Sequence, residues 1–467
     1  MKRVALYIAL ALIGYQVKAQ SDLTLPFFGD VFQSTYFNPT ARAEHTLSVG
    51  IPGISSISVQ GIHNGFVPNS IAYWDWSIDS LIVDPNLLPD VLKDQNMIFA
   101  HAGLEILHVR LKVHSWDFWF AVRQNHDISF FYPKDLFRFA IEGNEPMLGD
   151  KINFTPLGLN ATVYREYTYG MSAEVNKWIF GGRISLLQGL ANAYFKPNSF
   201  ELSIDDDMYA HTLNADATLY TSGVPIDFVS SEDSDFLTPD VNVDKFKNTD
   251  YIIKYLTRFR NPGMALSGGV AYKFDQKTTF TFSFSDLGFI SWSDSTKNYN
   301  ISGEATFDGF DALSDILYSR SFNPDSLLQS FVENFDDQSF SGNYTTWLSP
   351  KFYLTANYQL FRRTQLGFQF YTTVNRKVYP AFTIAASQGL GRAFNLMLSA
   401  SYNQRTATNF GVGLLLKPGP VQIYMMADNF YFPTSLNNML TFTNVNFRFG
   451  MNLVFGRVKT PQGMPYR

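Results

Sequence analysis

The sequence predicts an all-β protein: one closed, transmembrane antiparallel barrel of about 14 strands, with short turns at one end and long, partly helical loops at the other. Three observations predict it. Apolar and polar residues alternate along many segments of roughly the 9–11 residues that a tilted membrane strand needs. The connections between these segments alternate between short and long. Aromatic residues make up 16% of the 467 residues, with 44 Phe and 25 Tyr, and so many rings need a surface to cover.

The clearest strand covers residues 445–455. Because successive side chains of a strand point to opposite faces, one face here is apolar and the other mostly polar. The apolar positions are Val445, Phe447, Phe449, Met451, Leu453 and Phe455. A soluble sandwich would bury the apolar face against a second sheet, whereas a barrel turns it to lipid and its polar face to the lumen. Residues 278–292 repeat the pattern, with Phe280, Phe282 and Phe284 opposite small polar residues.

Composition excludes several kinds of site. The chain has no cysteine, which excludes disulfides, thiolate metal sites, cysteine nucleophiles and lipid attachment through an N-terminal cysteine. The net charge is −5 and 16% of the residues are charged, so the sequence gives no electrostatic basis for binding nucleic acid. After the N-terminal segment, no window reaches the roughly 18 uninterrupted apolar residues that predict a membrane-spanning helix.

Residues 1–19 are predicted to be a secretory signal peptide. Lys2 and Arg3 supply its positive region, residues 4–13 its apolar region, and Val17 and Ala19 the small-residue cleavage site. A membrane anchor is the alternative, but the apolar run is far shorter than the roughly 20 residues that a spanning helix needs. The mature chain is therefore expected to start at residue 20.

Residues 20–43 are predicted to form a plug inside the lumen or a cap on its periplasmic mouth. Pro26, Gly29 and Pro39 interrupt any regular structure. The apolar residues that need cover are Leu25, Phe27, Phe28, Val31, Phe32, Tyr36 and Phe37. A segment this apolar would be prone to aggregate if it were left exposed.

Residues 44–456 are predicted to form the barrel, and residues 457–467 a periplasmic C-terminal tail. The predicted strands cover residues 45–62, 97–113, 116–132, 159–175, 178–194, 264–274 and 278–292, then shorter segments from 352 to 455. The short connections are at residues 114–115, 176–177, 275–277, 362–364, 390–392 and 417–420. Short turns are typical of the periplasmic side, and an even number of strands places both termini there.

The long connections, expected outside the cell, contain the predicted helices. Residues 64–95 hold an aromatic group (Tyr73, Trp74, Trp76) and a helical patch at 87–93. A helix is predicted at 134–142, and two more at 308–318 and 325–335. Residues 196–262 form the largest and most acidic excursion.

Candidate metal sites are weak. His101 and His108 are seven residues apart on one strand, so a regular alternation places them on opposite faces, where they cannot chelate together. The run Asp205, Asp206 and Asp207 could bind calcium through carboxylate oxygens. It lacks the glycine and the spaced ligands of a calcium loop, and a solvated hairpin tip is the favoured interpretation.

The sequence assigns no catalytic, cofactor-binding or metal-binding residue, and it predicts that the protein is not an enzyme. Ser283, Ser285, Ser399 and Ser401 lie on polar strand faces with no histidine in register beside them, and no G-x-S-x-G motif occurs. Glycine pairs such as Gly181 with Gly182 lie within strands, where barrel curvature explains them.

Two local features remain. Residues 164–167 combine Tyr164, Arg165, Glu166 and Tyr167, and an interfacial aromatic girdle with a local ion pair is favoured over a rim contact to a lipid headgroup or ligand. Asp286 interrupts the Phe280 alternation, which predicts a β-bulge that bends the strand and could open a lateral gap.

Several motifs resemble a known family. They include residues 37–39 (FNP), 49–55 (VGIPGIS), 104–108 (LEILH), 132–137 (YPKDLF), 187–191 (LQGLA), 286–292 (DLGFISW) and 446–452 (NFRFGMN). Together they are similar to a Bacteroidetes outer-membrane β-barrel family of unknown function. That family looks like a relative of the long-chain fatty-acid transporter barrels and of the type IX secretion shuttle barrel. The resemblance implies an N-terminal plug, and it supplies no known reaction and no catalytic residue.

Two functions stay open. One is an occluded outer-membrane channel or transporter for a small apolar or amphipathic molecule; the other is a structural barrel that docks other cell-envelope or secretion-system proteins. Expected contacts are outer-membrane lipid and lipopolysaccharide, with no nucleic acid and no cofactor. A carrier of apolar cargo should have an apolar lumen, but the predicted inward positions are mostly small and polar: Thr279, Ser283, Thr355, Asn357, Gln369, Ser399 and Asn403. Trp119, Tyr353 and Tyr371 are predicted to point inward among them.

Overall fold

The computed structural model describes residues 23–42, 44–206, 210–224, 226–231, 234–241, 260–307, 335–375, 377–391, 393–403, 406–428 and 444–457. The predicted signal peptide (1–19), the helices predicted at 308–318 and 325–335, and the tail after residue 457 lie outside the described residues, except that Phe335 begins a strand. Within the described part, no helix is both long and apolar enough to cross a membrane.

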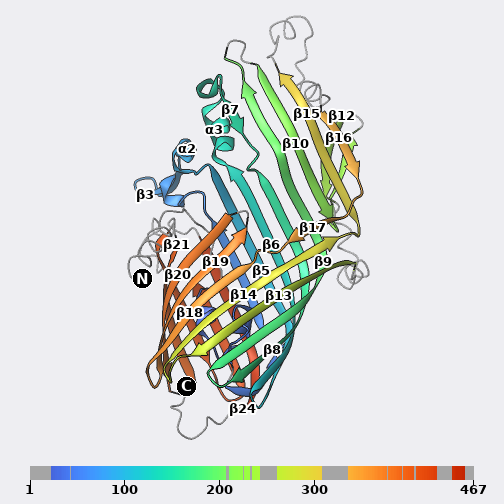
Figure 1. Cartoon of the computed structure of the whole chain (residues 1–467). Helices are drawn as coiled ribbons and strands as arrows, with labels where there is room; N and C mark the ends of the chain where they lie inside the picture. Colours follow the sequence, from blue (N-terminus) through green and yellow to red (C-terminus); the bar gives the residue numbers. More distant parts are fainter. Residues whose placement is uncertain are drawn as a thin grey trace, which may run out of the picture.

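The described strands form a closed antiparallel barrel of 14 strands, as predicted (Figure 1). Around the wall they are β1 (His45–Gly50) with β2 (Ser56–His63), β5 (Gln95–Val113), β6 (Trp116–Pro133), β8 (Gly158–Val175), β9 (Trp178–Ile204), β13 (Asn261–Lys273), β14 (Thr278–Trp292), β17 (Tyr344–Trp347) with β18 (Lys351–Phe361), β19 (Thr364–Asn375), β20 (Lys377–Leu390), β21 (Phe394–Asn403), β22 (Thr406–Leu416), β23 (Val421–Asp428) and β24 (Asn444–Arg457). The ring closes because β24 pairs with β23 on one side and with β1 and β2 on the other.

Short turns join neighbouring strands at one end of the barrel, where the sequence placed them. The tightest ones use residues that tolerate a left-handed backbone: φ is +54° at both His114 and Asn176. Alternation fixes which side chains line the barrel. Phe282 is 45% exposed on the outside, whereas the neighbouring Ser283 is 1% exposed on the inside. This is the pattern that the aromatic alternation predicts.

The long connections at the other end contain short elements. The first holds η3 (Pro68–Ser70), the hairpin of β3 (Ala72–Asp75) and β4 (Ser80–Val83), η4 (Pro85–Leu87) and α2 (Leu88–Val91). The second holds α3 (Lys134–Glu142), which has the predicted bounds, η5 (Glu145–Met147) and β7 (Lys151–Asn153). A separate hairpin pairs β11 (Ile226–Ser231) with β12 (Ser234–Val241).

The prediction that residues 196–262 form one long connection is wrong in part, because many of these residues lie in β9, β10 and the β11–β12 hairpin. β9 continues to Ile204 and turns into β10 (His211–Ser222), with Asp205 N bonded to the Ala210 carbonyl at 2.8 Å. The acidic run therefore begins at a hairpin tip, which was the favoured interpretation, although Asp207 itself is not among the described residues.

Three strands extend the wall beyond the mouth. β10 pairs with β9 above the point where β13 ends, β15 (Thr296–Phe307) pairs with β10, and β16 (Phe335–Phe340) pairs with β15. We call β10, β15, β16, β7 and the part of β9 from Asn192 onward the extension; Figure 1 shows it projecting past the barrel. Asn261 joins the two parts, since its side chain bonds to Ser222 at 3.2 Å and accepts from the backbone of Ser293 at 3.0 Å.

One face of the extension is mostly apolar, and protein covers it at the end of β9. Leu202 and Ile204 of β9 pack with Met147, Ile152 and Phe154, and α3 adds Leu136 and Phe139. The other face continues the lumen side of the wall and carries polar cross-strand pairs such as Thr218 with Asn300.

Candidate functional site: the plugged lumen

The segment 23–42 lies inside the barrel, which confirms that the apolar N-terminal residues are covered. It contains two short 3-10 helices, η1 (Leu25–Phe27) and η2 (Phe32–Tyr36), and from Leu23 to Phe37 most of its residues are buried. We call residues 23–42 the plug. Many of its backbone amides bond within the plug, for example Phe28 N to the Leu25 carbonyl at 2.9 Å and Val31 N to the Phe28 carbonyl at 3.0 Å, which supplies partners for an irregular backbone inside the barrel.

Buried ions hold the end of the plug that leads into the barrel. Arg42 Nε lies 2.7 Å from Asp117 Oδ2, and the two side chains are 5% and 0% exposed. Arg110 lies 3.5 Å from the same carboxylate and donates to the Ala41 carbonyl at 2.7 Å. Arg42 also donates to the Ser115 carbonyl at 2.9 Å, at the β5–β6 turn. Removing one partner from such a buried group leaves an uncompensated charge, so this anchor is costly to break.

A different carboxylate holds the first described residues of the plug. The Leu23 backbone N–H donates to Asp428 at 2.9 Å, and the Thr24 hydroxyl donates to the other oxygen of Asp428. Thr24 Oγ1 also lies 2.8 Å from Ser399 Oγ on β21. These contacts come from β21 and β23, whereas Asp117 lies on β6.

The middle of the plug bonds to Glu105 of β5. Gln33 donates to Glu105 at 2.9 Å and to the Ser55 carbonyl at 3.1 Å, and the Tyr36 hydroxyl donates to the second Glu105 oxygen. His108 bonds to Glu105 at 2.6 Å, and its ring stacks on Phe32 with 3.8 Å between centroids. The plug is therefore fixed at both ends and at its centre.

The wall under the plug is locally apolar. Leu23, Leu25, Phe27 and Phe28 belong to one buried cluster with residues of β20 to β23, namely Ala381, Ala385, Met397, Leu415, Tyr424 and Met426. Glycines make room for it: a Cβ at Gly367 would meet the Phe27 ring, at Gly413 the Phe28 ring, and at Gly181 the Pro39 carbonyl. Barrel curvature alone is thus the wrong explanation for Gly181, because this position lets plug backbone approach the wall.

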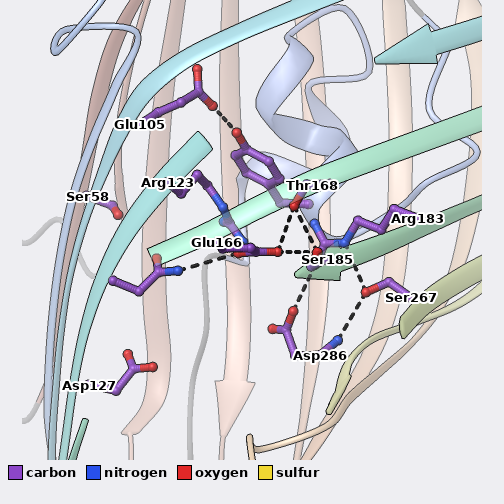
Figure 2. Close-up of polar contacts among 12 residues, drawn as sticks. Ser58, Glu105, Arg123, Asp127, Glu166, Thr168, Arg183, Ser185, Ser267 and Asp286 are labelled. Atoms are coloured by element: carbon purple, nitrogen blue, oxygen red, sulfur yellow. Dashed lines mark hydrogen bonds and ion pairs between the residues drawn. The ribbon is translucent and has the colours of Figure 1, made fainter. Parts of the chain in front are cut away.

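Another part of the wall, formed by β6, β8, β9, β14 and β18, carries a network of paired charges, and we call it the charged wall. Arg123 on β6 pairs with Glu166 on β8, and its guanidinium lies 3.8 Å from the centre of the Tyr36 ring. On the neighbouring strands Asp286 pairs with Arg183 at 2.8 Å and with Lys351 at 2.6 Å. Figure 2 shows Arg123, Glu166, Arg183 and Asp286 near one another; they come from β6, β8, β9 and β14.

Hydroxyl groups complete this network. Thr168 and Ser185 donate to Glu166 at 2.9 and 2.6 Å (Figure 2). The Ser267 hydroxyl oxygen accepts from Arg183 at 2.9 Å and from the Asp286 backbone N–H at 3.1 Å. Glu166 thus has both a cation and hydroxyl partners, and the Asp286 carboxylate has two cations, which offsets the cost of removing these charges from water.

The structure corrects two predictions about these residues. The interfacial girdle predicted for residues 164–167 is wrong for Tyr164 and Glu166, which are 8% and 3% exposed within the lumen. His101 and His108 are not on opposite faces, because a bulge between Glu105 and Leu107 shifts the alternation by one residue. His101 bonds to Asp127 at 2.6 Å and His108 to Glu105, so both face the lumen.

The bulge predicted at Asp286 is confirmed. The register of β13 and β14 shifts there, and Asp286 has φ of +62°, a conformation that is uncommon for a residue other than glycine. This backbone turns the carboxylate inward to Arg183 and Lys351.

Two small cavities lie beside the plug in the described part of the lumen. One small cavity is lined by Phe27, Asn357, Gly367 and Met397, and another, next to the charged wall, by Ser58, His101, Glu105, Arg123 and Arg448. The second has room for about one water molecule. Among the residues described, no group of three or more His, Asp or Glu side chains is placed to hold a metal ion.

A model of the family of unknown function DUF5723 matches residues 39–428. The chain belongs to this family. The resemblance predicted from the motifs is confirmed to that extent; the link to the type IX secretion barrel stays a prediction. A search of curated proteins finds no match to this DUF5723 member.

Several solved structures are similar to this DUF5723 protein at low sequence identity. The toluene transporter TodX of Pseudomonas putida is 8% identical over 91% of this chain and 94% of its own, with a TM-score of 0.41. A Pseudomonas aeruginosa FadL homologue is 10% identical over 95% and 100%, with a TM-score of 0.39. The translocator domain of the autotransporter NalP from Neisseria meningitidis is 8% identical over 88% of each chain, with a TM-score of 0.30.

Sequence reasoning placed most inward positions of the DUF5723 barrel correctly. Ser283, Thr355, Gln369 and Ser399 are buried in the lumen, as are Trp119, Tyr353 and Tyr371. It missed the charged wall, although a signal was available. Arg183 and Glu166 interrupt apolar strands, and a charge in a membrane strand belongs in the interior.

Proposed function

We propose that the chain is a non-enzymatic outer-membrane barrel that acts as an occluded channel for a small amphipathic molecule, with the plug as its closure. The observation that carries the proposal is the inner surface of the barrel that contacts the plug. This surface is apolar on β20 to β23 and carries paired charges on the charged wall. A molecule that replaced the plug would meet both surfaces. This favours amphipathic over purely apolar cargo.

Membrane insertion is supported by the outer surface. Large apolar side chains stand exposed on strands all around the barrel, for example Ile184 at 52%, Leu354 at 54% and Ile384 at 61%. A surface of this extent is stable against lipid and would aggregate in water. We therefore assign the barrel to the outer membrane, in contact with lipid and lipopolysaccharide.

A cysteine pair tests the plug as closure, because the natural chain has no cysteine. The oxygens of Thr24 and Ser399 are 2.8 Å apart, so Thr24→Cys with Ser399→Cys should form a disulfide that locks the plug to β21. In proteoliposomes, deletion of residues 23–42 should open a conductance. The oxidised double variant should stay closed to amphipathic solutes, and reduction should restore the wild-type flux; each single cysteine variant is the control.

The plug that fills the barrel also favours a second candidate, a structural barrel that docks envelope or secretion-system proteins. The described cavities are too small for a ligand. If deletion of the plug opened no conductance while envelope proteins co-purified with the intact barrel, transport would be rejected in favour of this role.

A further inference from the structure

We propose that the lumen-side face of the extension binds a neutral oligosaccharide. The inference concerns a surface above the barrel mouth and goes beyond the proposed channel. Every residue on this face of β10 and β15, and of β9 from Asn192 to Ser203, is either polar or a tyrosine. On the neighbouring strand β16, Phe340 lies opposite Asn298 on the same face and is 42% exposed. One apolar ring among polar residues is far less than the apolar core of a protein interface, which speaks against a protein partner.

A row of aromatic rings runs from the mouth onto this face. Trp292 stacks on Tyr344 with 6.2 Å between centroids, Tyr344 lies 5.1 Å from Tyr220, and Tyr220 stacks on Tyr194 at 6.2 Å. The three tyrosines are half-buried, so each keeps part of its ring accessible. The apolar C–H face of a pyranose packs on such a ring, and successive rings can hold successive sugar units.

Groups that both donate and accept hydrogen bonds flank the rings. Asn300 donates to Thr218 at 2.9 Å, Asn198 donates to Asp216 at 3.2 Å, and Tyr344 donates to Asn192 at 2.9 Å. Sugar hydroxyls also donate and accept, so amides and hydroxyls of this kind suit them better than they suit an ion.

Charge selects the class of sugar. Glu201, Asp216 and Glu304 lie on this face against Lys196 alone among the described residues of the three strands. An anionic polysaccharide would be repelled by this excess of carboxylates. On the opposite face, Leu202 and Ile204 pack with residues of α3 and of the segment 147–154.

The test is calorimetry on the full-length protein in detergent, with neutral hexasaccharides of glucose, mannose and N-acetylglucosamine, heparin as the anionic probe and a polylysine peptide as the cationic one. Binding of a neutral hexasaccharide is expected, and the double variant Tyr194→Ala, Tyr220→Ala should weaken it about tenfold, because it removes two of the rings in the row. Tyr169→Ala is the matched control, because Tyr169 is 58% exposed on the outside of the barrel.

Conserved far-UV circular dichroism of the double variant separates lost binding from misfolding. Asn300→Asp, which keeps the side-chain size, gives a second readout and should also weaken binding. The proposal is overturned if no neutral hexasaccharide binds at millimolar concentration, if only heparin or polylysine binds, or if the double variant binds as tightly as the wild type.

Discussion

Strand β9 passes through two environments, and its outward side chains differ accordingly. In the barrel, Ile184 and Leu186 are 52% and 46% exposed. In the extension, Leu202 and Ile204 of the same strand are 7% and 2% exposed beneath α3 and its neighbours. An apolar face needs cover in water and needs none in lipid. The place where protein begins to cover the strand therefore marks the upper edge of the proposed membrane contact.

The largest change in the free energy of unfolding is expected from replacing one of two leucines on β9, one in the extension and one in the barrel. Leu202→Ala should cost about 2–5 kcal/mol, because it removes buried methyl groups and leaves a cavity. Leu186→Ala should cost less, since lipid fills the space and only the transfer term is lost. Urea unfolding in lipid vesicles gives both values, and hydrogen exchange locates the loosened segment. An equal or larger cost at Leu186 would place it in a protein interior.

A charge placed on either side of the boundary gives a second contrast. Phe282→Arg should destabilise the barrel by about 2–4 kcal/mol if the residue lies near the bilayer midplane. Asn214→Arg, on the open polar face of the extension, should stay within about 0.5 kcal/mol of the wild type. Refolding into lipid vesicles measures both variants, and a neutral Phe282→Arg would mean that the faces of β14 are reversed.

The smallest effect concerns how α3 covers the extension. Arg138 and Glu142 form an exposed pair at 3.2 Å, so Arg138→Ala should cost about 0.3–0.5 kcal/mol. Phe139→Ala, one residue further along the helix, should cost several times more because Phe139 packs on the covered cluster. Hydrogen exchange of β9 from Asn192 to Ile204 reports on both. Similar protection in the two variants would show that α3 does not act as an apolar cover.

Most of the barrel could be predicted because its rule is local. A strand that separates lipid from a lumen repeats with a period of two, so Phe282 and Ser283 are assigned to their faces from sequence alone. The turns at His114 and Asn176, the helix α3 and the cover of the plug's apolar residues likewise follow from short-range pattern. The charged wall was harder to predict from the sequence, because its residues come from five strands, β6, β8, β9, β14 and β18.

The sequence by itself determined the fold class, the two faces of each strand and the need to bury residues 25–37. Tertiary structure alone decided what depends on pairing between distant strands. The bulge next to Glu105 turned His108 into the lumen, and β9 exchanged β13 for β10 as its neighbour near Asn261. The reason for glycine at positions 367 and 413 is visible only in the folded structure, because the Phe27 and Phe28 rings of the plug occupy the space that a Cβ would need. Alternation is set by neighbours in the chain, whereas register and partner exchange are set by contacts between residues tens to hundreds of positions apart, about which a local pattern carries no information.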